Sequence, residues 1–225
     1  MSRTRERARP AAPRAAPVEA EPEKRRAILH AALRVFAEKG YHGCRIADVA
    51  RQAGVAYGLV YHYFRNKDEL LESVFAEQWT ILLGAIRAIA DGPGTAAEQI
   101  ASVIHFAMDV FRTAPAAVRV LILEVPRTPD VVRAGTTRET FENTVRLIAD
   151  IVRRGQEAGE LCRDVDPMVA ASSVLGVLDM NLAGMVTGLL TAPQPSEEEL
   201  ERMKRQVVQA ALRGIVASGG DPGSR

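Results

Sequence analysis

The sequence predicts an all-α protein in which a small N-terminal helical unit precedes a longer helical bundle. Apolar residues recur at spacings of three and four along most of the 225 residues, whereas the period-two alternation of a half-buried strand is nearly absent. Hydrophobic residues make up 47% of the chain, which is enough to bury a sizeable core. Glycine and proline interrupt the periodic pattern and so separate the predicted helices.

The first predicted helix covers residues 24–39, and two shorter helices follow within residues 45–64. Apolar residues define one face of the first short helix, and Gly54 can adopt the left-handed backbone that ends a helix. A second periodic run begins at Leu59. Two short helices joined by a tight glycine turn form a helix-turn-helix, which reads DNA by placing its second helix in the major groove.

A long helix is predicted over residues 67–90, directly after this unit. Asn66 can cap its start, and Glu69 completes a capping-box-like pattern three residues later. A Gly-Pro-Gly turn at 92–94 ends the helix. The remaining predicted helices cover residues 96–112, 115–124, 130–158 (with an interruption at Gly135), 167–190 and 196–217.

Three phrases in the N-terminal part occur in a fixed order: ILHAALRVFAEKGY, IADVARQAGV and GLVYHYFRNKDELL. Together they resemble the N-terminal domain of the TetR (tetracycline repressor) family, over roughly residues 22–82. The resemblance implies a three-helix DNA-binding domain followed by a C-terminal helical bundle for ligand binding and dimerisation. It also implies a homodimer formed through the last two helices, 167–190 and 196–217.

We therefore expect four segments. Residues 1–21 form a basic, disordered leader, which is either a solvated tail or an arm that touches DNA. Residues 22–82 form the DNA-binding domain, with the helix-turn-helix at 45–64. Residues 83–218 form the ligand-binding and dimerisation domain, and 219–225 form a frayed tail. The leader lacks the apolar stretch of a secretory signal.

Charge is distributed unevenly along the chain. Residues 1–67 contain 14 Lys and Arg against 6 Asp and Glu, whereas residues 68–225 contain 15 against 22. Basic side chains near DNA displace condensed counterions. The coincidence of the basic surplus with the helix-turn-helix therefore favours double-stranded DNA as a partner.

Residues on the second short helix and at the neighbouring helix starts are candidate DNA contacts, because such positions reach base edges or phosphates. Gly58 would let the backbone approach the duplex closely. Solvation is the alternative reading of His62, and core packing is that of Tyr63. The candidates are Arg45, Tyr57, Gly58, Tyr61, His62, Tyr63 and Lys67.

Two positions depart from the family's pattern. A Thr or Ser commonly caps the first short helix, where this chain has Cys44 and Arg45. A Ser followed by a basic residue commonly opens the recognition helix, where this chain has Ala56 and Tyr57. Loss of a cap weakens a helix start by about 1 kcal/mol. Arg45 could replace a lost phosphate contact and Tyr57 could stack on a base, so the operator cannot be copied from relatives.

Residues 168–192 form an apolar stretch long enough to span a bilayer. Asp179 and Asn181 fall at its centre, where a charge is costly in lipid. We therefore expect a buried interface helix and no membrane partner.

Isolated polar residues occur among apolar ones between residues 79 and 179, as they do around ligand cavities in helical proteins. The family resemblance implies such a cavity for a small, hydrophobic effector. Ordinary core packing or a solvated position is the alternative reading of each residue. The candidate lining residues are Trp79, His105, Met108, Asp109, Phe141 and Asp179.

We find no pattern that indicates catalysis. The four histidines lack metal-ligand spacing, and no nucleophile elbow or phosphate-binding loop occurs. We expect no catalytic residues, no metal and no cofactor. Cys44 and Cys162 lie far apart and are read as free thiols of a reducing cytoplasm.

The sequence thus predicts a cytoplasmic, sequence-specific transcriptional regulator, with repression as the expected mode and a small-molecule effector that releases it from DNA. A dimer would place its two readers in successive major grooves about 34 Å apart, which requires a palindromic operator. The alternatives are an effector-independent or architectural DNA-binding protein and an enzyme built on a helical bundle.

Overall fold

The computed structural model describes residues 20–129, 131, 135–192, 195–213 and 215–216. Within these ranges the regular elements are helices, with no β-strand beyond one isolated bridge between residues 161 and 216. The predicted all-α class is confirmed for this part of the chain. The predicted leader and tail fall almost entirely outside the described residues.

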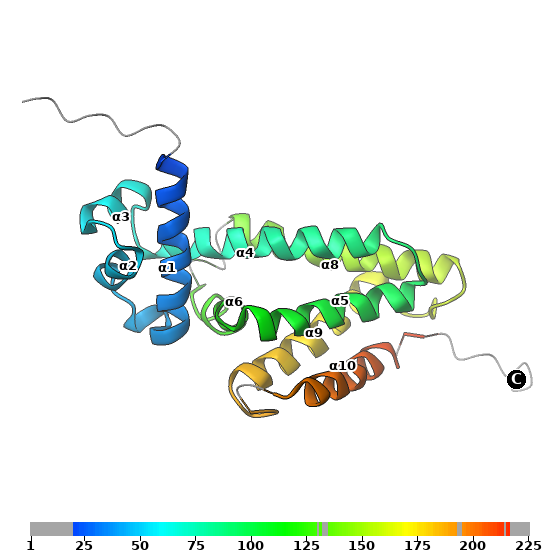
Figure 1. Ribbon diagram of the computed structural model, residues 1–225. Coiled ribbons are helices and arrows are strands. Elements are labelled where there is room, and N and C mark those ends of the chain that lie inside the picture. Colours follow the sequence, from blue (N-terminus) through cyan, green and yellow to red (C-terminus); the bar gives the residue numbers. More distant parts are fainter. Residues whose placement is uncertain (1–19, 130, 132–134, 193–194, 214, 217–225) are drawn as a thin grey trace, which may run out of the picture.

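Three helices form a compact group at one end of the elongated molecule: α1 (Ala20–Gly43), α2 (Ile46–Ala53) and α3 (Tyr57–Tyr63) (Figure 1). The backbone of Gly40 has φ 69°, which interrupts α1 near the predicted end of this helix. Gly54 has φ 67° and closes α2 in the left-handed conformation. The glycine turn predicted between α2 and α3 is therefore present.

Helix α4 (Lys67–Ala90) leads from this group along the C-terminal helices (Figure 1). The Asn66 side chain accepts a hydrogen bond from the Glu69 N–H at 2.8 Å, as predicted. The Glu69 carboxylate accepts from the N–H of Arg65, not from that of Asn66. The capping box is therefore only half formed, because the Glu69 carboxylate bonds to Arg65, the residue before the cap.

In the C-terminal part, α5 and α8 pack against α4. Helix α9 lies against α8 and α10, and α10 also packs on α5. Thr95 and Ser196 form complete capping boxes at the starts of α5 and α10. The elements are α5 (Ala96–Thr113), α6 (Pro115–Arg119), the π-helix η1 (Val120–Glu124), α8 (Gly135–Glu157), α9 (Pro167–Val186) and α10 (Glu197–Leu212).

The segment predicted as one helix over 115–124 changes its winding part-way. Residues 115–119 are α-helical, and Val120–Glu124 form a single π-helical turn. A π-turn accommodates an extra residue in the helix and is frequent at functional sites. The predicted end at residue 124 is right, but no sequence pattern indicates the irregular turn.

Helix α9 ends four residues before the predicted end at Leu190. Gly188 has φ 75°, and the N–H groups of Leu189 and Leu190 both bond to the carbonyl oxygen of Gly184. The chain turns back so closely that a Cβ on Gly184 would lie 2.5 Å from a Leu190 methyl. The apolar pattern continued past the helix because Leu190 folds back onto it.

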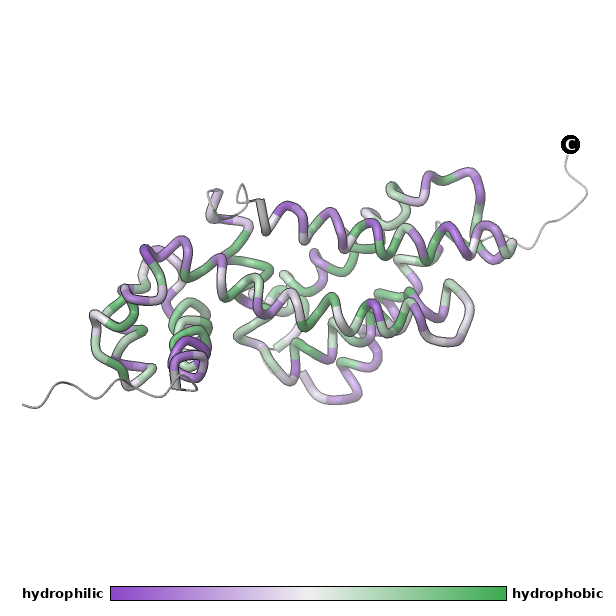
Figure 2. The backbone as a smooth tube through the Cα atoms, turned by 90° about the horizontal axis from the view of Figure 1, so that it is seen from above, coloured by the Kyte–Doolittle hydropathy of each residue, from purple (hydrophilic) through white to green (hydrophobic). Residues whose placement is uncertain are grey.

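Buried apolar side chains form one core around α1–α4 and others among α5, α8, α9 and α10. The N-terminal core also contains Val120 of η1 and Val125 just beyond it. Hydrophobic and hydrophilic stretches alternate along the helices (Figure 2). The π-turn therefore belongs to the same packed core as the helix-turn-helix.

Among the described helices, α9 is long and apolar enough by length and composition to cross a membrane. In the structure it packs against α5, α8 and α10, and Ala171 and Val174 are fully buried. Apolar core helices of ordinary proteins meet the same length and composition test.

Candidate DNA-binding surface and effector cavity

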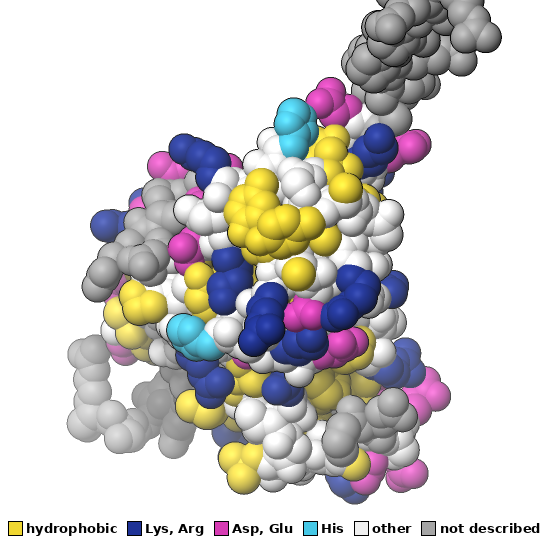
Figure 3. Space-filling view, turned by 90° about the vertical axis from the view of Figure 1, so that its left-hand side faces the viewer, with side chains coloured by type: hydrophobic (Ala, Val, Ile, Leu, Met, Phe, Trp, Pro, Cys, Tyr) yellow, Lys and Arg dark blue, Asp and Glu magenta, His cyan; other side chains and the backbone are white. Residues whose placement is uncertain are grey.

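The exposed face of α3 carries two tyrosines. Tyr57 is 54% exposed and Tyr61 45%, and their hydroxyls lie 3.3 Å apart. Their rings meet edge to face at 5.2 Å. Viewed from this end, hydrophobic side chains lie beside a group of Lys and Arg side chains (Figure 3). An aromatic pair next to positive charge can contact thymine methyls and phosphates at once.

Gly58 lies between these tyrosines in sequence. A Cβ placed on it would meet no atom within 4 Å. The folded chain alone therefore gives no steric reason for a glycine, because an alanine would fit. A close approach of DNA to the helix backbone would supply one.

His62 and Tyr63 both lie near the start of α1. The His62 imidazole is 3.6 Å from a carboxylate oxygen of Glu21 and remains exposed. The Tyr63 hydroxyl donates to the Glu21 carbonyl oxygen at 3.2 Å, and the ring is half-buried. Tyr63 thus has a structural role beside its predicted DNA contact.

The two predicted cap losses are visible in the structure. Neither Arg45 at the start of α2 nor Ala56 at the start of α3 makes a side-chain cap hydrogen bond. Arg45 is exposed and borders the same end of the molecule. Both helix starts therefore leave N–H groups available to another acceptor, such as a phosphate oxygen.

Lys67 has partners within the chain. Its ammonium donates to the carbonyl oxygens of Tyr41 at 2.8 Å and Cys44 at 3.3 Å, and lies 4.2 Å from the centre of the Tyr41 ring. The Tyr41 hydroxyl donates to Asp68. Lys67 therefore ties the start of α4 to the end of α1, and its contact with DNA stays a prediction.

Cys44 is buried beneath this junction. Burial raises the pKa of its thiol to about 11, so the thiol stays protonated and unreactive at neutral pH. Cys162 is partly accessible and is also a free thiol.

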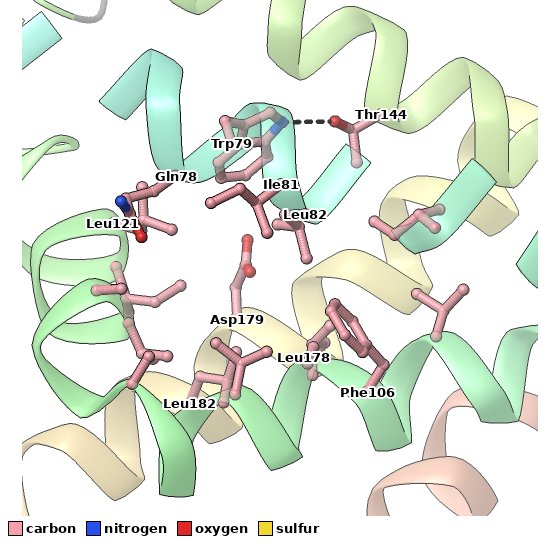
Figure 4. Close-up of a pocket in the computed structure, with 18 of the residues that line it drawn as sticks. Gln78, Trp79, Ile81, Leu82, Phe106, Leu121, Thr144, Leu178, Asp179 and Leu182 are labelled. Atoms are coloured by element: carbon pink, nitrogen blue, oxygen red, sulfur yellow. Dashed lines mark hydrogen bonds between the residues drawn. The ribbon is translucent and has the colours of Figure 1, made fainter. Parts of the chain in front are cut away.

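A cavity of about 310 Å³ lies between α4, α5, α6, η1, α8 and α9 (Figure 4). Its walls are mainly aliphatic and aromatic side chains, including Leu82, Phe106, Leu178 and Leu182. A second cavity of about 280 Å³ shares lining residues with it and is lined by α4, η1, α8 and α9. Small-molecule sites in proteins have this size and apolar character.

Trp79 forms part of both cavities and is held firmly. Its indole N–H donates to the Thr144 hydroxyl at 2.9 Å, and the hydroxyl donates in turn to the Thr140 carbonyl oxygen. Its ring packs against Phe75 at 5.1 Å and Phe141 at 4.9 Å between centres. The side chain is therefore a fixed wall element.

Asp179 also lines both cavities, and its carboxyl group points toward Trp79 and Leu82 (Figure 4). The residue is exposed overall, and partial desolvation of the carboxyl by burial raises its pKa to about 6. It is the one charged side chain among the described residues that line the two cavities.

Of the predicted lining residues, Trp79 and Asp179 line the larger cavity and Phe141 the smaller one. Three others lie elsewhere: Met108 is fully buried in the core, and His105 and Asp109 line neither of these cavities. Asp109 instead accepts a hydrogen bond from the Lys204 ammonium at 2.5 Å. Sequence reasoning missed Thr144 and the η1 residues Leu121 and Ile122, which carry no distinctive local pattern.

Glu124 connects the cavity wall to the DNA-binding end. This buried carboxylate, the last residue of η1, accepts a hydrogen bond from the Tyr41 N–H at 2.7 Å. A Cβ on Gly40 would lie 3.4 Å from a Glu124 oxygen, so the kinked end of α1 rests against the carboxylate. Leu121 and Ile122, on the preceding turn, line the cavity.

Within the described part of the chain, no group of three His, Cys, Asp or Glu side chains is placed to hold a metal ion. The arrangement is that of a regulator: a helix-turn-helix with an exposed second helix, joined by one long helix to a mainly apolar cavity.

Family comparisons agree with this arrangement. Residues 28–74 match the family of bacterial regulatory proteins called tetR, and residues 97–211 match the tetracyclin repressor-like C-terminal domain. The chain belongs to the TetR family. It is a DNA-binding transcriptional regulator of the repressor class that small-molecule ligands release.

Relatives in this family span nearly the whole chain. The fatty acid metabolism regulator protein of Bacillus subtilis is 30% identical over 190 residues, which is 84% of this chain and 93% of the relative. The transcriptional regulator UidR of Escherichia coli is 23% identical over 200 residues, 89% of this chain and 96% of UidR.

Solved structures show the same fold. The regulator FadR of Bacillus subtilis in complex with stearoyl-CoA has a TM-score of 0.75 and 25% identity, covering 84% of this chain and 98% of FadR. The ketosteroid regulator KstR2 of Mycobacterium tuberculosis has a TM-score of 0.69 and 19% identity, covering 87% and 96%, and shows likeness of fold alone.

Proposed function

We propose that this chain acts in the cytoplasm as a homodimeric repressor, and that a molecule with a long apolar chain releases it from a palindromic operator. One observation carries the proposal: α4 serves both functional regions. Its first residue, Lys67, is bonded to the loop that precedes α2, and its middle, from Gln78 to Ile86, forms a wall of the cavity. A ligand that displaces this part of α4 would also move the start of the helix, which supports the helix-turn-helix.

The proposed DNA contacts lie at the free end of the molecule. Tyr57, Gly58 and Tyr61 would meet base edges, and Arg45 and His62 would meet phosphates, because all five positions are exposed. Tyr63 and Lys67 would mainly position the reader through their intramolecular bonds, with phosphate contact as a secondary role. We assign residues 22–82 to DNA binding and 83–218 to ligand binding and dimerisation.

The proposed dimer forms through α9 and α10. Along α9 the residues at 169, 173, 176, 180 and 183 repeat at spacings of four and three, which places them on one face. Val169 is 58% exposed and Met180 73%, while Gly176 between them is small enough for close helix approach. An exposed stripe of this kind on an apolar helix favours pairing with a second copy.

The proposed effector follows from the cavity and from a relative. The larger cavity is mainly apolar, and FadR of Bacillus subtilis was solved with stearoyl-CoA. We therefore propose a ligand whose chain enters the space beside Trp79, with acyl thioesters as the first class to test. An effector acts only through a difference in affinity for the two states of the protein.

The test begins with selection of random duplex DNA on the full-length protein at about 150 mM salt, where non-specific binding is already weak. The expected product is a palindrome. Acyl-CoA thioesters of increasing chain length, with free CoA as control, are then titrated into the complex while DNA anisotropy and Trp79 fluorescence are followed. Release by the long-chain members alone supports the proposal. DNA binding that no thioester alters would contradict the effector class.

A further inference from the structure

The carboxylate of Asp179 is a polar group on the cavity wall that lacks a partner among the residues the structure describes. The Trp79 N–H is bonded to Thr144, and the Thr113 hydroxyl donates to a carbonyl oxygen of its own helix. No hydrogen bond or ion pair to Asp179 occurs within the described part of the chain, and no described cationic side chain lines either cavity. Gln78 also lines the larger cavity, with an uncharged amide, so Asp179 is the one charged acceptor without a partner among the described lining residues.

A purely apolar ligand would conflict with this arrangement. Filling the cavity with a hydrocarbon chain would remove water from the carboxylate, and an isolated buried charge is costly unless a donor or an opposite charge meets it. A ligand carboxylate at the same place would add repulsion between like charges. A ligand that brings a donor would supply the missing hydrogen bond.

The position of Asp179 fixes where that donor would lie. Asp179, Trp79, Leu121 and Ile122 line both cavities, so the carboxylate lies where the two spaces adjoin. At roughly 30 Å³ for a water-sized group, the larger cavity of 310 Å³ holds about ten non-hydrogen atoms. A chain of about that length could occupy the larger cavity while its polar end reaches Asp179.

We propose that Asp179 makes the regulator selective, among the apolar-chain effectors proposed above, for those in which a hydroxyl or protonated amine adjoins an apolar chain of about ten atoms. The selectivity rests on the function proposed above, because it assumes that the cavity is the effector site. The proposal adds the requirement that the ligand carry a hydrogen-bond donor, which an apolar cavity alone would not impose. It assigns this requirement to Asp179.

Three probes of equal chain length separate this requirement from simple hydrophobic binding: decylamine, decanol and decanoate, each below its aggregation concentration. The full-length protein has one tryptophan, Trp79, so intrinsic fluorescence reports on the cavity wall itself. The titrations use the natural protein, Asp179→Asn and Asp164→Asn. The last variant removes one carboxylate from an exposed position outside both cavities.

We expect the natural protein and Asp164→Asn to bind decylamine and decanol at least about tenfold more tightly than decanoate, the size of one hydrogen bond to a charged group. In Asp179→Asn, the three affinities should lie within about threefold of one another. Equal binding of decanol and decanoate by the natural protein would overturn the proposal, as would unchanged discrimination in Asp179→Asn.

The experiment distinguishes failure of the proposed effector site from failure of the proposed role of Asp179. If no probe and no thioester changes Trp79 fluorescence or DNA binding in any of the proteins, the cavity is not an effector site and the selectivity falls with it. If thioesters release DNA but the probes show no preference, the repressor function stands and only the role of Asp179 is wrong.

Discussion

The surface of α3 and the wall of the larger cavity depend on very different ranges of the chain. The exposed residues proposed to meet base edges lie within five consecutive positions, Tyr57 to Tyr61. The cavity wall collects side chains from Gln78 to Leu182, across six helical elements. The reader is thus a local structure that can be altered residue by residue, whereas the cavity exists only when the whole C-terminal fold is formed.

Replacing Tyr61 with alanine should show this local character most strongly. We expect affinity for the selected operator to fall by at least about fivefold, since one good contact to DNA contributes about 1–3 kcal/mol. The thermal midpoint and the response of Trp79 to ligands should stay unchanged, because the side chain is exposed. Anisotropy at about 150 mM salt measures the loss; unaltered DNA affinity would remove Tyr61 from the interface.

Glu124→Ala tests the connection between the two regions. The Tyr41 N–H would lose its acceptor, which costs about 1–3 kcal/mol for a buried group. Denaturant unfolding should show this loss, and ligands should still bind but release DNA less completely. Glu124→Gln keeps an oxygen acceptor and serves as the control. Full ligand-induced release in a folded Glu124→Ala protein would show that coupling runs through α4 alone.

Asp179→Asn should stabilise the protein in a pH-dependent way. Because the pKa of Asp179 is raised to about 6 in the folded protein, above its ordinary 3.8, ionisation opposes folding above pH 6. We expect a gain of about 1 kcal/mol at pH 8, reduced from the full shift because cavity water still solvates the carboxylate. The gain should fade as the pH falls from 6 toward 4. Denaturant unfolding at pH 8 and pH 4.5 measures the difference, and a gain independent of pH would contradict it.

Gly58→Ala gives the smallest effect on the fold and the sharpest contrast between regions. Alanine in place of glycine within a helix should stabilise the protein by about 0.5–1 kcal/mol, because the added Cβ meets no neighbour. The same methyl group would stand between α3 and DNA, so operator affinity should fall while stability rises. Parallel measurement of both quantities checks this, and unchanged affinity would argue against close backbone approach.

The contrast explains which parts of the molecule the sequence could predict. The cap at Asn66 and the glycine turn at Gly54 depend on residues a few positions apart, so both were predictable. The end of α9 was not, because Leu190 continues the apolar pattern by folding back onto Gly184. The partner of Asp109 was also hidden, since Lys204 lies 95 residues away.

The cavity shows the same limit. Trp79 and Asp179 stood out as unusual residues in their helices, and both line the cavity. Leu121 and Ile122 look like ordinary core residues, and only the π-turn turns them toward the cavity while Glu124 meets Tyr41. A local sequence pattern cannot reveal a helix that changes its winding.

The π-turn has a consequence for how this protein tolerates length changes. An α-helix advances about 100° per residue, so deleting one residue from Val120–Glu124 would rewind the turn and rotate everything on one side of the deletion. Either the pair Leu121 and Ile122 would leave the cavity, or Glu124 would swing away from Tyr41. A single-codon deletion in this turn would therefore separate ligand binding from DNA binding in one step.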